Sequence, residues 1–186
     1  MIRKRLVKVD DAKYILLVLE NDTLGLNSIP ATLSLLSEIP AYRRHVRDRQ
    51  CSTIEISSTP PWVGRICEII LRLYSGDPVP REEIESIPLK AENLRLKELL
   101  EIPHGKVITY SRLAERLGLS LRTTVRLLVR NPYPLIIPCH RVVRKNGHVG
   151  GYLGSLKYSF IKAEILRREG VRVDDKGFVN REALIY

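Results

Sequence analysis

The sequence has few of the residues that build disulfide frameworks and metal sites. Three cysteines in 186 residues are too few for a disulfide framework, although a bridge between Cys51 and Cys67 stays open. The cysteines form no Cys-x-x-Cys pair and the four histidines lack metal-ligand spacing, so we predict no metal. No segment reaches the roughly 18 apolar residues that a membrane-spanning helix needs, and the basic N-terminus lacks the apolar run of a signal peptide. We therefore expect a cytoplasmic protein with no membrane partner.

Positive charge is in excess, and it is concentrated in the second half of the chain. The formal net charge is +10 at pH 7. Residues 1–90 hold 13 Lys and Arg against 12 Asp and Glu, whereas residues 91–186 hold 18 against 9. Because ordinary surface charge does not explain so uneven a distribution, we expect residues 91–186 to bind a polyanion.

The first half alternates predicted strands and helices, which indicates an α/β domain over residues 1–90. Apolar runs and β-branched residues predict strands over 3–9, 13–20, 23–29 and 51–57. Helical spacing predicts helices over 31–38, 41–49 and 62–74, the last ending at Gly76. The segment 80–90 is expected to be a connector to a second domain, residues 91–186.

The second half contains two short predicted helices joined by a tight turn at Gly118, which is typical of a helix-turn-helix. Other predicted elements are helices over 92–102 and 156–169, an extended piece over 106–109, and hairpins at 145–148 and 171–180. In the second helix of the pair, over 121–130, Leu121, Val125 and Leu128 share one face and are expected to pack on the domain. Arg122, Arg126 and Arg130 form a neighbouring stripe that is expected to face phosphates.

A cysteine and a histidine stand side by side after an apolar run, in Leu135-Ile136-Ile137-Pro138-Cys139-His140-Arg141. An inert buried thiol is one reading of Cys139. The adjacent His140 and the basic surroundings favour a reactive thiolate instead. Neighbouring side chains on a strand point to opposite faces, so the pair needs a turn or a bridging water to communicate. A cysteine protease is a weaker reading, because such enzymes usually recruit their histidine from far along the chain.

A longer run of residues around the cysteine is highly specific. It reads Asn131-Pro132-x-Pro134, then Pro138-Cys139-His140-Arg141-Val142-Val143, then Gly150-Gly151-Tyr152. This run resembles the active-site signature of the O6-alkylguanine-DNA alkyltransferase family, and the likeness extends over about residues 92–170. The resemblance implies an α+β protein: a ribonuclease-H-like α/β domain over 1–90, and a winged helix-turn-helix-like alkyltransferase domain over 91–186 that binds DNA and accepts the alkyl group.

The resemblance also implies an activity, which is repair of DNA by direct reversal of damage. An alkyl group would pass irreversibly, in a single turnover, from O6-alkylguanine in double-stranded DNA to Cys139, with no cofactor and with the protein as a monomer. Cys139 would be the nucleophile, and His140 would act as its base through a water. Glu169 would orient His140, and Tyr110 would donate a proton toward the departing guanine.

The remaining implied residues bind DNA or the flipped base. Arg122 would enter the duplex and fill the gap left by the base, with Thr123, Arg126, Arg130 and Asn131 along the same helix. The base pocket would be walled by Tyr110, Val142, Tyr152, Leu153 and Ser155. The chain departs from the family pattern where Thr123, Val125 and Arg126 replace small residues on this helix. Leu153 also stands where many members have serine.

Two other functions remain open from the sequence. A non-enzymatic relative would bind alkylated DNA without accepting the group, but such relatives typically lack the cysteine. A helix-turn-helix regulator could sense alkylation through Cys139, although such a regulator usually needs dimerisation or an added module. The sequence leaves open the preferred alkyl group, the role of the N-terminal domain and the depth of groove entry.

Overall fold

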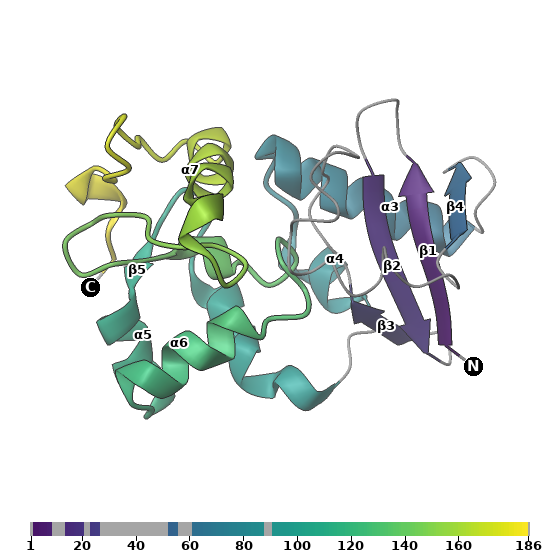
Figure 1. Cartoon of the computed structure of the whole chain (residues 1–186), viewed down its shortest axis with the longest axis horizontal. Helices are drawn as coiled ribbons and strands as arrows, with labels where there is room; N and C mark the ends of the chain where they lie inside the picture. The colour runs from purple at the N-terminus through teal and green to yellow at the C-terminus, as the bar shows by residue number, and fades with distance from the viewer. Residues whose placement is uncertain are drawn as a thin grey trace. The chain divides into compact units, whose positions relative to one another are not determined.

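The computed structural model describes residues 2–8, 14–20, 23–26, 52–55, 61–87 and 91–185. The predicted helices over 31–38 and 41–49, and Cys51, lie outside these residues. The chain divides into two units, residues 1–74, 79–92 and 132–136 in unit 1 and residues 75–78, 93–131 and 137–186 in unit 2. The described elements mix helices with two separate sheets, as an α+β protein does (Figure 1).

Unit 1 contains a four-stranded sheet in the order β3-β2-β1-β4. Neighbours pair antiparallel except β1 and β4, which are parallel. The strands are β1 (Ile2–Lys8), β2 (Tyr14–Glu20), β3 (Thr23–Leu26) and β4 (Ser52–Glu55). The sequence predicted all four to within a few residues, because their apolar and β-branched runs are bounded by turn residues.

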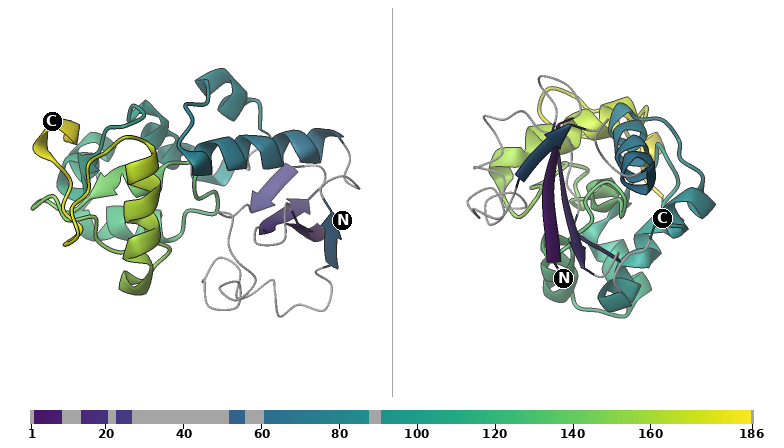
Figure 2. Two further views of the ribbon diagram at one scale, coloured as in Figure 1. Left: turned by 90° about the horizontal axis from the view of Figure 1, so that it is seen from above. Right: turned by 90° about the vertical axis from the view of Figure 1, so that its right-hand side faces the viewer.

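One long helix, α3 (Pro61–Ser75), runs along a face of this sheet (Figures 1 and 2). Ile66, Ile69, Ile70 and Leu73 are buried on one side of it, as their spacing predicted. The segment 80–90, for which the sequence predicted only a connector, contains a short helix, α4 (Arg81–Glu85). An ion pair between Arg81 Nε and Glu85 Oε1, 2.8 Å apart, spans this single turn.

Unit 2 carries the remaining elements. They are η2 (Ala91–Glu101), β5 (Ile108–Thr109), α5 (Tyr110–Leu117), α6 (Leu121–Val129), η3 (Cys139–Arg141), β6 (Val142–Val143), η4 (Leu156–Tyr158), α7 (Ser159–Arg168) and η5 (Arg181–Ala183). Two helices of unit 2 differ from their predicted form. The predicted helix over 92–102 is the 3₁₀-helix η2, and the buried Leu96 and Leu99 within it and Ile102 directly after it recur every three residues, the period of that helix. The predicted helix over 156–169 is divided into η4 and α7.

The helix-turn-helix forms where it was predicted, because capping residues fix its boundaries. Thr109 Oγ1 accepts a hydrogen bond from the Arg112 backbone N–H, 3.2 Å away, at the start of α5. Gly118 ends α5 with a φ of 60°, and the Ser120 hydroxyl caps α6. The strand β5 pairs in parallel with β6, with Ile108 opposite Val142. This pairing places the first turn of α5 beside the segment that carries Cys139.

The packing of α6 differs from the prediction. Leu121 and Val125 were expected to lie against the domain, but they are 53% and 39% exposed, and Val129 is 53% exposed. Leu128, the third residue of the predicted face, is buried as expected, and Thr124 is buried with it. The apolar stripe of α6 therefore faces outward, beside the arginines.

Both predicted hairpins are present. The turn at 144–148 is closed by the Arg144 N–H, which donates to the His148 carbonyl at 2.9 Å, and Gly147 adopts a φ of 85°. In the second hairpin, Val173 pairs with Val179. No helix within the described ranges is long and apolar enough to span a membrane.

Candidate active site and nucleic-acid interface

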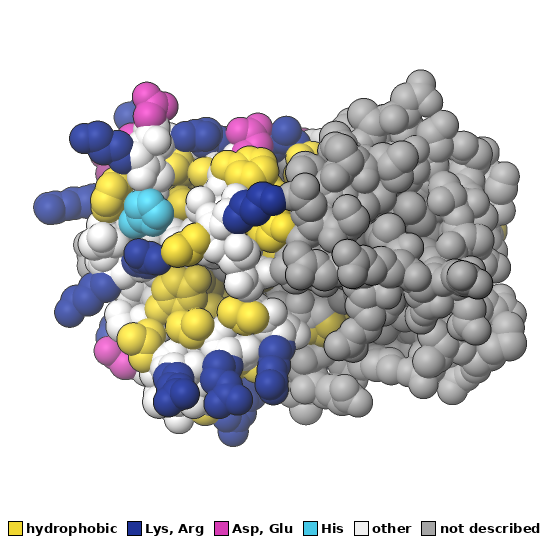
Figure 3. Space-filling model, viewed as in Figure 1, with side chains coloured by type: hydrophobic (Ala, Val, Ile, Leu, Met, Phe, Trp, Pro, Cys, Tyr) yellow, Lys and Arg dark blue, Asp and Glu magenta, His cyan; other side chains and the backbone are white. Residues whose placement is uncertain are grey.

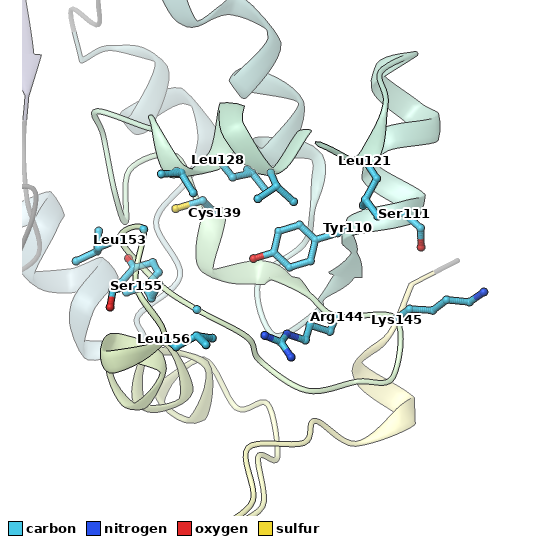
Figure 4. A pocket seen from close by; sticks show the side chains of 15 residues that line it. Tyr110, Ser111, Leu121, Leu128, Cys139, Arg144, Lys145, Leu153, Ser155 and Leu156 are labelled. Atoms are coloured by element: carbon cyan, nitrogen blue, oxygen red, sulfur yellow. The ribbon is translucent and has the colours of Figure 1, made fainter. Parts of the chain in front are cut away.

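Cys139 lies at the floor of a hollow of about 460 Å³ (Figure 4). It begins a single 3₁₀ turn, η3, after Pro138, and only 8% of its surface is exposed. Burial raises the pKa of the thiol, while a hydrogen bond with the Asn131 side chain and the charge of Lys162 lower it by less. The Asn131 amide also donates to the Ile137 carbonyl at 2.9 Å, which links the end of α6 to the cysteine segment.

His140 and Glu169 form a buried pair beside this turn. His140 Nε2 and Glu169 Oε1 are 2.8 Å apart, and both side chains are 1% exposed. Burial alone would raise the pKa of Glu169, but the charges and hydrogen bonds of His140 and Arg141 hold it below its ordinary value. An ionised carboxylate only accepts hydrogen bonds, so Nε2 must carry the proton. Nδ1 of a neutral imidazole is then the basic nitrogen.

Nδ1, the second ring nitrogen of His140, is available to act as a base. Burial lowers the pKa of the imidazole, outweighing the opposing effect of Glu169, so the ring is neutral near pH 7. Nδ1 is buried and has no hydrogen-bond partner within the described part of the chain. The sequence predicted that His140 acts on Cys139 through a water, and this nitrogen is the atom that such a water would contact.

Arg141 balances the charge of Glu169. Its Nε donates to Oε2 and its Nη2 to Oε1, both at 2.9 Å, which is a two-pronged contact with the carboxylate. Its Nη1 donates to the carbonyl of Ile102 at 2.8 Å. Glu169 is thus held by two side chains from the cysteine turn. Arg141 belongs to the motif recognised in the sequence, but no role was predicted for it.

A buried lysine is the main feature that the sequence reasoning missed. Lys162 is 1% exposed, and its Nζ donates to the Val142 carbonyl at 2.5 Å. The same atom lies 5.5 Å from the centre of the Tyr110 ring, a cation–π contact. Burial lowers the pKa of Lys162 to about 8, although the charge of Cys139 acts in the opposite direction. The available signal was its spacing of four residues from Tyr158 and seven from Glu169, which places it on the buried face of α7.

Tyr110 is the first residue of α5, and it lines the hollow with its hydroxyl directed toward the side where Cys139 lies (Figure 4). Burial and the nearby charge of Cys139 raise the pKa of its phenol, while Arg144 lowers it by less. The phenol therefore keeps its proton at neutral pH and is placed to donate it within the hollow.

The predicted wall residues Tyr152, Leu153 and Ser155 all line the hollow, whereas Val142 does not. Tyr152 and Ser155 exchange two backbone hydrogen bonds of 2.9 Å across a tight turn. The two central residues of this turn, Leu153 and Gly154, have φ values of 48° and 79°. A leucine at positive φ is strained, because its Cβ crowds the backbone. The apolar residues of α6 complete the rim, namely Leu121, Val125, Leu128 and Val129.

The predicted DNA-binding residues of α6 point to solvent. Arg122, Thr123, Arg126 and Arg130 are all exposed. The Thr123 hydroxyl also lies 2.8 Å from that of Ser120 at the start of the helix. Figure 3 shows Lys and Arg side chains gathered along the edge formed by α5 and α6, with an apolar patch beside them. In the described ranges, no group of three or more His, Cys, Asp or Glu side chains is placed to hold a metal ion.

Part of the chain is similar in sequence to known proteins. Residues 93–171 match the family described as 6-O-methylguanine DNA methyltransferase, DNA binding domain. A methylated-DNA–protein-cysteine methyltransferase of Methanothermobacter thermautotrophicus is 48% identical over 73 residues, 39% of this chain and 40% of that protein. One of the same name from Saccharolobus solfataricus is 42% identical over 105 residues, 55% of this chain and 66% of that protein. The matches thus span less than two thirds of these relatives.

Solved structures resemble more of the chain. An O6-methylguanine DNA methyltransferase of Methanococcus jannaschii is 29% identical, with a TM-score of 0.62 over 91% of this chain and 95% of that one. An O6-methylguanine methyltransferase of Mycobacterium tuberculosis has the same TM-score at 20% identity, over 94% and 96% of the two chains, which shows a shared fold. Residues 93–171, which contain the cysteine site described above, are therefore similar to the domain described as 6-O-methylguanine DNA methyltransferase, DNA binding domain.

Proposed function

We propose that the protein repairs DNA by transferring the alkyl group of an O6-alkylguanine irreversibly to Cys139, once per protein molecule. The observation that carries this proposal is the buried group around the thiol. A histidine with a free basic nitrogen, a fixed carboxylate and a buried lysine surround a cysteine at the floor of a hollow. The names of the relatives support the same chemistry, since they are cysteine methyltransferases acting on methylated DNA.

The reaction needs no cofactor, because its bonds and protons balance within the site. The thiol proton of Cys139 passes through a water to Nδ1 of His140, and Glu169 stabilises the resulting imidazolium. The thiolate attacks the alkyl carbon, a C–S bond forms and the C–O6 bond breaks. The departing guanine takes a proton from Tyr110, and the imidazolium returns one to the phenolate through solvent. The thiol proton therefore ends on guanine.

Lys162 contributes a positive charge while the thiolate exists. Its buried position beside Cys139 opposes the effect of burial on the thiol pKa. Electrostatic stabilisation of this kind is stronger in a site that excludes water. We assign Lys162 the role of a positioning residue, because it acts through the thiolate and through the Val142 carbonyl that it holds.

The DNA partner is double-stranded and carries the lesion, and the exposed arginines of α6 bind its phosphates. The base must leave the stack to reach a thiol at the floor of a hollow, at a cost of a few kcal/mol. Arg122 fills the gap, and the outward apolar stripe of α6 contacts the groove. The finer architecture is part of this proposal: a ribonuclease-H-like domain over 1–90, and a winged helix-turn-helix-like catalytic domain over 91–186 that works as a monomer.

The direct test is to mix the protein with a duplex containing O6-methylguanine and to weigh its peptides. We expect one added methyl group on the peptide that carries Cys139. Cys139→Ala should abolish the gain, whereas Cys67→Ala, which removes another buried free thiol, should retain it. Lesion binding without any mass gain would overturn the proposal and support the non-enzymatic reading instead.

A further inference from the structure

A second hollow, of about 740 Å³, lies next to the active-site hollow. The two hollows share Ser111 and Lys145 as lining residues. The second is also bordered by Arg112 and Arg181, and a single carboxylate, Glu115, faces it. A segment leaving the active-site hollow past Lys145 would therefore enter a second depression that is also basic.

The cations around the two hollows are largely uncompensated. Glu115 is held by Arg112, whose Nη1 is 2.8 Å from Oε2. Across the described residues, Arg144, Lys145 and Arg181 take part in no ion pair, and no Asp or Glu lines the active-site hollow. Like charges gathered around a concave surface repel one another, and a concave surface focuses their field. Such a surface favours an anion.

The backbone that carries these cations is fixed at several points. Arg144 and Lys145 lie in the hairpin closed by hydrogen bonds of 2.9 Å to His148 and 2.8 Å from Gly147. Arg181 begins η5, whose Ala183 carbonyl accepts a 2.8 Å bond from the Val107 N–H. In Figure 4, Arg144 points into the active-site hollow, whereas Lys145 points away from it. The hairpin thus presents Arg144 to the active-site hollow and directs Lys145 away from it.

We propose that Arg144, Lys145 and Arg181 form a track for the sugar–phosphate backbone of the lesion-bearing strand. The track leads from the mouth of the active-site hollow into the second hollow. Phosphates beside the flipped nucleotide would contact Arg144 and Lys145, and a phosphate further along the same strand would contact Arg181. The Ser111 hydroxyl, on the wall shared by the two hollows, is a further phosphate donor. The proposal rests on the proposed function and extends its DNA contacts beyond α6.

The first test compares the salt dependence of duplex binding among variants. The double variant Lys145→Ala with Arg181→Ala is matched by Arg95→Ala with Lys97→Ala, which removes the same charges from exposed positions on η2. The binding constant falls as the salt concentration rises, and each lost phosphate contact makes the plot of log K against log salt concentration less steep by about 0.9. We therefore expect the first pair to reduce the slope by about two and the second to leave it near wild type. Equal slopes for both pairs would overturn the track.

The second test determines which phosphates of the lesion-bearing DNA strand lie on the track. Single phosphates of the lesion strand are replaced in turn by uncharged methylphosphonates. We expect replacements on one side of the lesion to weaken wild-type binding several-fold and to have no further effect on the Lys145→Ala, Arg181→Ala variant. Equal losses in both proteins would refute the track. Because methyl transfer is measured separately on the wild-type protein, failure of the track is distinguishable from failure of the proposed function.

Discussion

Replacing Lys162 with methionine should make the protein more stable and less reactive. Burial lowers the pKa of Lys162 from 10.5 to about 8. At about 1.4 kcal/mol per pKa unit, keeping this lysine charged costs about 3 kcal/mol of folding stability near neutral pH. Methionine removes this cost but loses the hydrogen bond to Val142, worth about 1 kcal/mol. We expect a net gain of about 2 kcal/mol.

The pH dependence separates this electrostatic cost from a packing effect. The folded-state pKa lies below the unfolded value of 10.5, so the unfolded chain binds more protons between about pH 8 and 10.5. Wild-type stability should therefore rise across this window relative to Lys162→Met, and the advantage of the variant should shrink toward pH 10.5. Urea unfolding at several pH values measures the difference, with the exposed Lys176→Met as the control.

Reactivity should change in the opposite direction. Without the positive charge, the pKa of Cys139 rises further, and methyl transfer at pH 7 should slow by at least tenfold. The rate of methyl transfer should then increase only at a higher pH than in the wild-type protein. Lys162→Arg should restore part of the rate because it restores the charge. A variant that is less stable than wild type at pH 7, or that reacts at the wild-type rate, would refute the reasoning.

Two further predictions concern Glu169 and Leu153. Glu169→Gln leaves the buried Arg141 without its charge partner, so we expect the free energy of unfolding, measured in urea, to fall by about 3 kcal/mol or more. Because the pKa of Glu169 is lowered in the fold, wild-type stability should also decrease as the pH falls below about 4.5. A Glu169→Gln variant with the same acid sensitivity as wild type would contradict this assignment. Leu153→Asn should raise the free energy of unfolding by about 0.5–1 kcal/mol because asparagine tolerates positive φ, whereas Leu153→Val should lower it. Equal melting temperatures for the two variants would argue against strain at this turn.

Much of the fold follows from local signals in the sequence. The caps at Thr109, Ser120 and Gly118 define the helix-turn-helix, because each satisfies backbone groups within a few residues. On α6 the prediction was right for Leu128 and wrong for Leu121 and Val125, which have the spacing of a buried stripe. Spacing shows that residues share a face, but tertiary packing decides which face is buried, and Thr124 is buried in their place.

The catalytic arrangement could be predicted only in part. The Pro138-Cys139-His140-Arg141 motif indicated Cys139 as the candidate nucleophile, but the contacts of Lys162 and Arg141 join segments 20 and 39 residues apart. Nothing local in the sequence specifies such pairs. A lysine on a buried helix face is recognisable only once Tyr110, Val142 and Cys139 are known to surround it.

The two-residue pairing of β5 with β6 sets limits on how the chain can change in length. Thr109 and Val143 are paired across it, so Tyr110 and Cys139 each lie within a few residues of the same fixed point. Insertions in the hairpin turn at 144–148 leave that spacing intact. One residue added between Thr109 and Tyr110, or between Cys139 and Val142, would rotate the side chain of Tyr110 or Cys139 out of the hollow that both line. Related chains should therefore vary in loop length at the turns and keep these two intervals constant.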